Sequence, residues 1–255
     1  MATGPQQKRK ELREKRLKAE AAAKGKDRRQ NMAKIIGIAV ALGVIAIVAA
    51  VVISLSGGDD DAAPKDTSSI DKMLADIPQE GSVLGDPDAK VTLVEFGDLQ
   101  CPACRQYAEQ VLPDIIEGPV KNGKANFDFR QWTILGDDSV LAARAAYAAG
   151  EQGRYWQFLE NFYANQGIEH SGYVTDDFLT DIAEKSGVPD IDKWNEARED
   201  EQRWGTVLAD VDAEASSLGF TGTPSFAIQV GEGDPEPIAD TSSAEAIIKA
   251  INNAK

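Results

Sequence analysis

The chain has 255 residues and a formal net charge of −15, and this length fits one or two domains. Hydrophobic residues make up 42% of the chain and charged residues 27%, which excludes a wholly disordered protein. The charge is unevenly spread, because twelve of the 27 lysine and arginine residues, but only four of the 42 acidic ones, precede residue 35. The acidic remainder repels phosphate, so we expect no binding to nucleic acid.

The few cysteine and histidine residues exclude several further classes. The two cysteines lie three positions apart, which excludes a disulfide-stapled scaffold. The only histidine, His170, lies in a polar segment predicted to be a surface loop. A zinc site usually takes four ligands, and no second cysteine pair exists, so we expect no metal.

Residues 35–55 form a run of 21 residues without a charge. Because about 20 apolar residues span a bilayer as a helix, we interpret this run as a transmembrane helix that anchors the chain in the lipid bilayer. The alternative is a cleaved signal peptide, whose apolar core is usually shorter, roughly 7–15 residues. The basic arm 1–34 precedes the run and three aspartates at 59–61 follow it. The positive-inside rule then predicts a single-pass protein of the cell membrane, with the arm in the cytoplasm and the body outside.

The arm 1–34 has two interpretations. It is either a topology signal alone or also a ligand for anionic lipid, at about 1 kcal/mol per well-placed basic side chain. After the apolar run, residues 56–80 start with glycine, serine, aspartate and proline, and we predict that they form a linker. The folded body is then residues 81–255, the size of a normal single domain.

The body begins with a strand, a helix and a second strand. Residues 91–96 are rich in β-branched side chains and predict a buried strand. Apolar residues from Cys104 onward recur at helical spacing, and residues 125–134 alternate as a second strand. This βαβ unit predicts a parallel pair of strands. Residues 139–218 are mostly helical, and short strands and a closing helix follow, so the fold class is α/β with a helical insertion.

The motif that carries chemistry is Cys101-Pro102-Ala103-Cys104, at the junction between the first strand and its helix. A cysteine at a helix N-terminus meets backbone N–H groups and the positive end of the helix dipole, which lower the pKa of its thiol. The second cysteine lies one turn along and can close a disulfide with the first. A static structural disulfide is the plain alternative, but so short a loop gives little entropic stabilisation.

Four segments together resemble the DsbA-like branch of the thioredoxin-fold thiol–disulfide oxidoreductases. They are Gly-Asp-Pro-Asp-Ala at 85–89, Val-Glu-Phe-Gly-Asp at 94–98, the Cys-Pro-Ala-Cys motif and Gly-Thr-Pro-Ser-Phe at 222–226. The resemblance covers residues 81–255 and implies a thioredoxin-like fold whose inserted helical domain occupies about 139–218.

The resemblance also implies roles for individual residues. Pro224 would be a cis-proline facing the active-site disulfide, and the backbone of Thr223 would pair with a bound peptide. Glu95 would accept a proton from Cys104, its pKa raised by burial; the plain alternative is a partly exposed strand carboxylate. The strongest oxidants of the family carry a histidine where this chain has Ala103, which cannot donate charge to the Cys101 thiolate.

Asp98 has two equally supported interpretations, a cap of the active-site helix or a loop residue. For the whole chain we expect a dithiol oxidase that introduces disulfides into exported proteins, with no cofactor beyond the redox-active disulfide Cys101–Cys104. The resemblance implies reoxidation by a membrane partner of the DsbB or VKOR type. The alternatives are a reductant or isomerase of the same fold, and a non-catalytic peptide-binding or chaperone-like ectodomain.

Overall fold

The computed structural model describes residues 68–254. The predicted transmembrane helix 35–55 and the basic arm 1–34 lie outside these residues. Of the helices between residues 68 and 254, none combines the length and the apolar character that crossing a membrane requires.

A single mixed sheet, with strand order β1-β2-β4-β3-β5-β6, forms the centre of the described unit. The strands β3 and β4 pair in parallel, and Glu95 lies opposite Phe129 in their register. The other pairs are antiparallel. The parallel pair confirms the predicted βαβ unit, because only a crossover can return the chain to the same end of a sheet. The strands are β1 (Gln79–Glu80), β2 (Val83–Leu84), β3 (Val91–Gly97), β4 (Asn126–Gln131), β5 (Ser225–Val230) and β6 (Glu236–Pro237).

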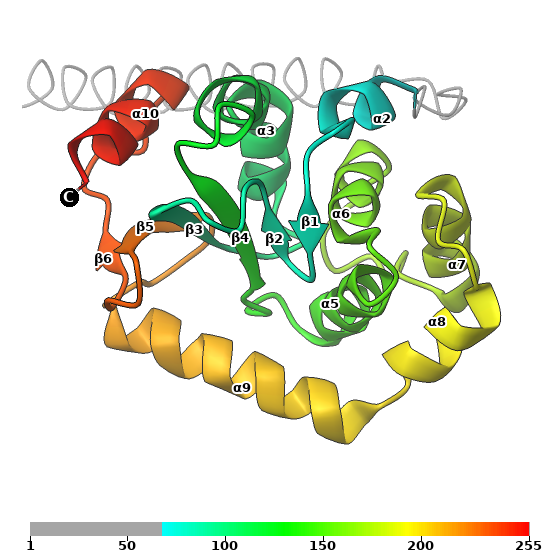
Figure 1. Ribbon diagram of the computed structural model, residues 1–255. Helices are drawn as coiled ribbons and strands as arrows, with labels where there is room; N and C mark the ends of the chain where they lie inside the picture. Colours follow the sequence, from blue (N-terminus) through cyan, green and yellow to red (C-terminus); the bar gives the residue numbers. More distant parts are fainter. Residues whose placement is uncertain (1–67, 255) are drawn as a thin grey trace, which may run out of the picture. The chain divides into compact units, whose positions relative to one another are not determined.

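Helices cover both faces of the sheet (Figure 1). They are α2 (Ser68–Leu74), α3 (Pro102–Gln110), α4 (Leu112–Ile115), the π-helical turn η1 (Ile116–Val120), α5 (Asp137–Gly150), α6 (Tyr155–Ala164), α7 (Asp176–Lys185), α8 (Ile191–Arg198), α9 (Glu201–Ser217) and α10 (Ala244–Asn253).

The alternation of side chains along β3 divides the core into two parts. Val94 and Phe96 pack with Val211 and Ala215 of α9 on one face. The side chain of Leu93 points to the other face, into the larger cluster that contains residues of α3, α6 and α10. Glu95 lies two residues after Leu93, so its side chain points to the same face of the sheet, into this larger cluster.

The helices α5–α9 lie between β4 and β5, the interval in which the sequence predicts a helical insertion. Alanines make up most of the buried side of α5, and their small size allows a close approach of neighbouring helices. Trp194 of α8 is fully buried, and its indole Nε1 donates to the Ala145 carbonyl over 2.9 Å. Trp194 therefore joins α8 to α5 through packing and through this hydrogen bond.

The predicted linker 56–80 is wrong for its described part. Residues 68–74 form α2 and residues 79–80 form β1, so the folded unit begins before Gly81. The physical reason is an apolar pattern that starts at Ile70: Leu74 and Ile77 are only 3% and 8% exposed and belong to the larger cluster. Polar residues surround these few apolar ones, which is why the segment resembles a linker in composition alone.

We predict that Leu74→Ala lowers the free energy of unfolding by about 2–5 kcal/mol, the usual cost of a buried leucine truncation. The measurement is urea denaturation of the purified chain. Ile168→Ala is the control, because Ile168 is 81% exposed and should change stability by less than about 0.5 kcal/mol. An equally small effect at Leu74 would mean that residues 68–80 are a linker after all.

Candidate active site

Cys101 lies at the point where the chain leaves β3 and enters α3. Its Sγ is the N-cap of α3 and accepts a hydrogen bond from the backbone N–H of Cys104 over 3.4 Å. Pro102 occupies the first turn, where the helix needs no N–H donor. The side chain of Cys101 is 7% exposed, whereas Pro102 and Ala103 are exposed. The motif thus presents one sulfur close to the surface.

The two sulfurs have opposite environments. A hydrogen bond from the Cys104 thiol lowers the pKa of Cys101 to about 6, against the effect of burial. The Thr223 side chain and the backbone of Ala103 and Cys104 act in the same direction as the Cys104 thiol. Cys104 is fully buried, and burial raises the pKa of its thiol well above the ordinary value. Both are free thiols in this structure. At neutral pH the first sulfur is therefore mostly a thiolate and the second a thiol.

The segment before β5 comes close to this thiolate. The peptide bond between Thr223 and Pro224 is cis, as the resemblance predicts. The Sγ of Cys101 lies 3.5 Å from the Thr223 carbonyl oxygen, to which the thiol form donates. Residues 122 positions apart in the sequence therefore meet at the reactive sulfur.

Glu95 lies in the buried part of β3, and its side chain is 2% exposed. Burial raises the pKa of Glu95 well above its ordinary value, and charges on Glu160 and Cys101 raise it further. Its charge in turn raises the pKa of Cys104, so the two groups lie within electrostatic reach of each other. This burial contradicts the alternative of a partly exposed strand carboxylate.

Asp98 has a role that sequence reasoning missed. Its carboxylate accepts hydrogen bonds from the backbone N–H groups of Gln100 (2.9 Å), Ile134 (2.9 Å) and Leu135 (3.0 Å). Burial raises the pKa of this fully buried carboxyl, and these hydrogen bonds act in the opposite direction. The cap interpretation is wrong, since Cys101 caps α3. Asp98 instead joins the loop before the motif to the loop after β4.

A glutamine of the helical insertion holds the same loop from another side. The side-chain amide of Gln166 donates to the carbonyls of Leu99 (2.6 Å) and Cys101 (3.2 Å). Gln166 lies 65 positions after Cys101, and nothing in the sequence pattern indicates that the two residues meet.

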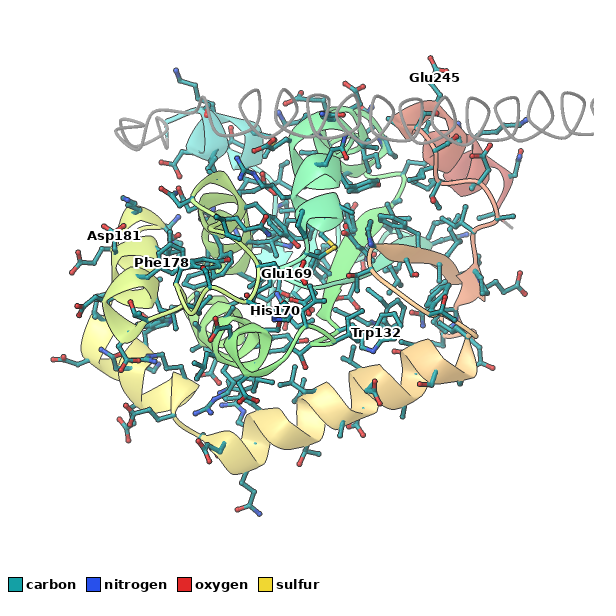
Figure 2. The ribbon with its side chains drawn as sticks, turned by 180° about the vertical axis from the view of Figure 1, so that it is seen from behind. Trp132, Glu169, His170, Phe178, Asp181 and Glu245 are labelled. Atoms are coloured by element: carbon teal, nitrogen blue, oxygen red, sulfur yellow. The ribbon has the colours of Figure 1, made fainter. Side chains whose placement is uncertain are left out.

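Four residues after Gln166, His170 lies on the surface beside Glu169, with its Nε2 2.9 Å from the carboxylate (Figure 2). The side chain of His170 is 63% exposed, which confirms the predicted surface position.

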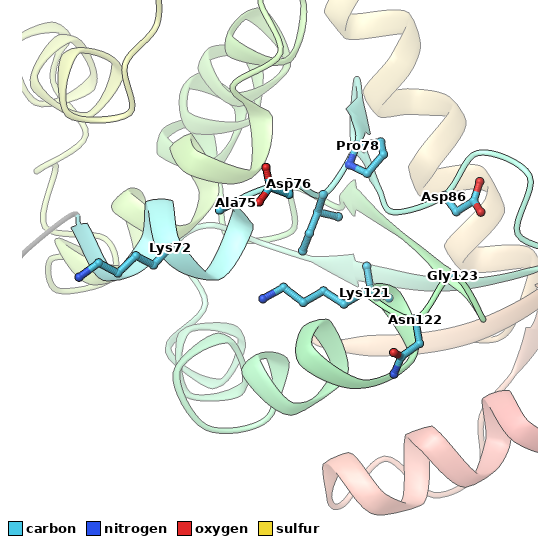
Figure 3. A pocket seen from close by; sticks show the side chains of 10 residues that line it. Lys72, Ala75, Asp76, Pro78, Asp86, Lys121, Asn122 and Gly123 are labelled. Atoms are coloured by element: carbon cyan, nitrogen blue, oxygen red, sulfur yellow. The ribbon is translucent and has the colours of Figure 1, made fainter.

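Other parts of the described structure provide no obvious second site for this chemistry. A cavity of about 690 Å³ lies between α2 and the end of η1 (Figure 3) and is lined by residues such as Lys72, Asp76 and Lys121, but by neither cysteine. Within residues 68–254, no group of three or more histidine, cysteine, aspartate or glutamate side chains could hold a metal ion.

Comparison with known proteins agrees with this geometry. A family model described as thioredoxin matches residues 78–252. The probable disulfide bond formation protein D of Bacillus cereus is 28% identical over 211 residues, which cover 82% of this chain and 93% of that protein.

Solved structures show the same architecture. A thioredoxin-like oxidoreductase from Silicibacter pomeroyi is 31% identical, with a TM-score of 0.52 over 72% of this chain and 98% of that one. Oxidised BdbD from Bacillus subtilis, at 24% identity, has a TM-score of 0.59 over 68% of this chain and 91% of that one, and supports the fold. The chain therefore belongs to the thioredoxin family, in which it is a DsbA-like thiol–disulfide oxidoreductase.

Proposed function

We propose that the protein is a dithiol oxidase that introduces disulfides into cysteine-containing proteins outside the cytoplasm. The observation that carries this proposal is the position of Cys101 at the N-cap of α3, beside a fully buried Cys104. There its Sγ accepts a hydrogen bond from the Cys104 N–H, and its pKa is lowered to about 6. A stabilised thiolate favours the reduced enzyme over its disulfide, and this makes the disulfide a better oxidant. Hydrogen-bond donors of α3 and Cys104 supply this stabilisation in place of a charged side chain at Ala103.

The proposed cycle uses the unequal sulfurs in a fixed order. A substrate thiolate attacks Sγ of Cys101, a new S–S bond forms, and the bond to Cys104 breaks. Cys104 leaves as a thiolate and takes a proton from Glu95. A second substrate thiolate then attacks the substrate sulfur of the mixed disulfide and releases Cys101 as a thiolate. Two electrons pass from the substrate, now a disulfide, to the enzyme, now a dithiol.

The substrate site of this proposal is the strand end at Thr223 and Pro224. Thr223 lies against the reactive sulfur, and its backbone can pair with an extended peptide that delivers the substrate cysteine. The exposed Pro102 and Ala103 leave the approach to Cys101 open. No further cofactor takes part in the proposed reaction, because the Cys101–Cys104 disulfide itself carries the two electrons.

The location and the partners are further parts of the proposal. The apolar run 35–55 would anchor the catalytic unit outside the cytoplasm, since basic residues precede it and acidic residues follow it. A membrane protein of the DsbB or VKOR type would then restore the disulfide. Exported proteins with unpaired cysteines would be the substrates, because disulfides form and persist in the oxidising environment outside the cytoplasm.

We predict that Cys104→Ser accumulates mixed disulfides between Cys101 and substrate proteins. In this variant the Cys101 thiolate attacks a substrate disulfide and one substrate thiolate leaves, and the mixed disulfide persists because no Cys104 thiol remains to attack it. Cells that produce this variant are treated with acid and an alkylating agent, and the complexes are resolved on non-reducing gels. The matched control is Cys101→Ser/Cys104→Ser, which should trap nothing, and Cys101→Ser alone should reduce dithiol oxidation to background. Equal function of the double variant and the wild type would favour the non-catalytic chaperone-like alternative.

The thiolate itself gives a second prediction. Alkylation of Cys101 by iodoacetamide in the reduced protein should rise with pH and level off above a midpoint set by its pKa of about 6, because only the thiolate reacts. The rate is followed by mass spectrometry of the modified peptide. Cys101→Ala should abolish this titration, and a midpoint near the ordinary cysteine value of about 8.5 would contradict the proposed stabilisation.

A further inference from the structure

A second buried carboxyl, Glu160 of α6, lies on the same side of the sheet as Glu95. Its side chain is 9% exposed, and its Oε1 has no hydrogen-bond partner among the described residues and no contact with solvent. Burial raises the pKa of Glu160 to about 8, and the Glu109 carboxylate acts in the same direction. At neutral pH this group is therefore a protonated acid in the core, and one of its two oxygens has no hydrogen-bond partner among the described residues.

Glu160 lines a cavity of about 120 Å³ between α2, α3 and α6. The cavity is large enough for several water molecules, each of which needs about 30 Å³. Its wall includes Glu109, whose side chain is 41% exposed, and the exposed Ser69, so it extends to the protein surface. Solvent in the cavity can thus reach the Glu160 carboxyl, although its Oε1 is closed off from it.

The inner wall of this cavity adjoins the redox site. Ala108, which lines it, lies one helical turn after Cys104 on the same side of α3. Tyr163 also lines it; its hydroxyl donates to the Asp98 carbonyl over 3.3 Å. The ring of Tyr163 lies 6.4 Å from that of Phe129, the strand partner of Glu95. The charge of Glu160 is also close enough to raise the pKa of Glu95.

We propose that Glu160 is the group through which the buried Glu95 exchanges its proton with solvent in this cavity. The inference rests on the proposed role of Glu95 as the proton partner of Cys104. When Cys104 leaves as a thiolate, Glu95 gives it a proton and becomes a carboxylate. Glu160 then reprotonates Glu95 and takes a proton from cavity water. During reoxidation the same proton moves in the opposite direction, from Cys104 to Glu95 to Glu160 to water.

The surroundings of Glu160 contain few other groups that titrate. From α3 the acting carboxylate is Glu109, which pairs with Arg105 at 2.9 Å, and from β3 it is Glu95. The cavity residues of α2 are Ser69 and Ile70, neither of which is an acid or a base.

The opposite side of α6 is aromatic. Phe158 contacts Trp194 of α8, and Phe162 contacts Phe178 of α7. Tyr163 is the other titratable side chain of α6 in the cavity wall, and burial raises its pKa well above the ordinary value. Glu160 is thus the carboxyl of α6 that borders the cavity. It acts through Glu95 and has no contact with the reacting sulfurs, so it is a positioning residue for the proton.

The test is proton uptake by the full-length protein in its disulfide form, followed with a pH indicator during single-turnover oxidation of a dithiol peptide from pH 6 to pH 10. Below the Glu160 pKa of about 8 the acid can deliver a proton, and above it the carboxylate cannot. We therefore expect Glu160→Gln to take up this proton about tenfold more slowly than the wild type at low pH, less than the roughly 10²–10⁴-fold of a direct acid. The ratio of the two rates should approach one as the pH rises.

Glu160→Asp keeps a carboxyl and should restore part of the rate, and the exposed Glu184→Gln of α7 is the control that should match the wild type. A wild-type rate and pH profile in Glu160→Gln would overturn the relay. If Glu95→Gln is slow in that case, only the relay fails; if Glu95→Gln also matches the wild type, the proposed role of Glu95 fails with it.

An infrared titration of the wild type keeps the proposal testable even if Glu160→Gln does not fold. A protonated carboxyl band should disappear with a pKa near 8 and shift in Glu160→Asp. Absence of any such band would overturn the relay.

Discussion

The unequal surroundings of two neighbouring sulfurs are the constraint on which the rest of the structure depends. Cys101 caps α3, where hydrogen bonds stabilise its thiolate, while Cys104 lies one turn deeper with no access to water. A pair of equivalent thiols would have no preferred order of attack and release. The parallel strands β3 and β4 create this difference, because they hold the start of α3 at the edge of a closed core.

Long-range hydrogen bonds keep the loop that bears Cys101 in place. Asp98 joins it to the loop after β4, Gln166 joins it to the helical insertion, and Thr223 approaches the sulfur from the strand β5 side. Each of these contacts comes from a different part of the chain, so the site is held by the whole fold. Such support limits reorganisation of the hydrogen-bond donors when the sulfur gains or loses charge.

The sequence predicts the parts of this site that depend on local patterns. The strand before the motif and the helix that starts at Pro102 follow from spacing and from the chemistry of short segments, whereas the burial of Glu95 is implied by the family resemblance. The cis bond at Pro224 follows only from the family resemblance. The contacts of Asp98 do not follow, because its partners are 36 and 37 positions away and offer backbone groups that every residue has.

The helix α2 and the position of Glu160 were missed for different reasons. In α2, Leu74 and Ile77 are too few to produce a clear pattern in a polar segment, and only the tertiary packing shows that they are buried. Glu160 lies among aromatic residues of a strongly apolar helix, where one acid is easily taken for an exposed side chain. Its occurrence four residues after the buried Trp156 is the signal that places it on the buried side.

The reduction potential of the Cys101–Cys104 pair tests the central claim most directly. The full-length protein is equilibrated with glutathione buffers, and the fractions of dithiol and disulfide are measured after acid quenching and alkylation. Proteins of this fold range from about −270 mV for reductants to about −120 mV for strong oxidants. Stabilisation of the Cys101 thiolate predicts a value towards the oxidising end, whereas a value near −270 mV would contradict it and make the protein a reductant.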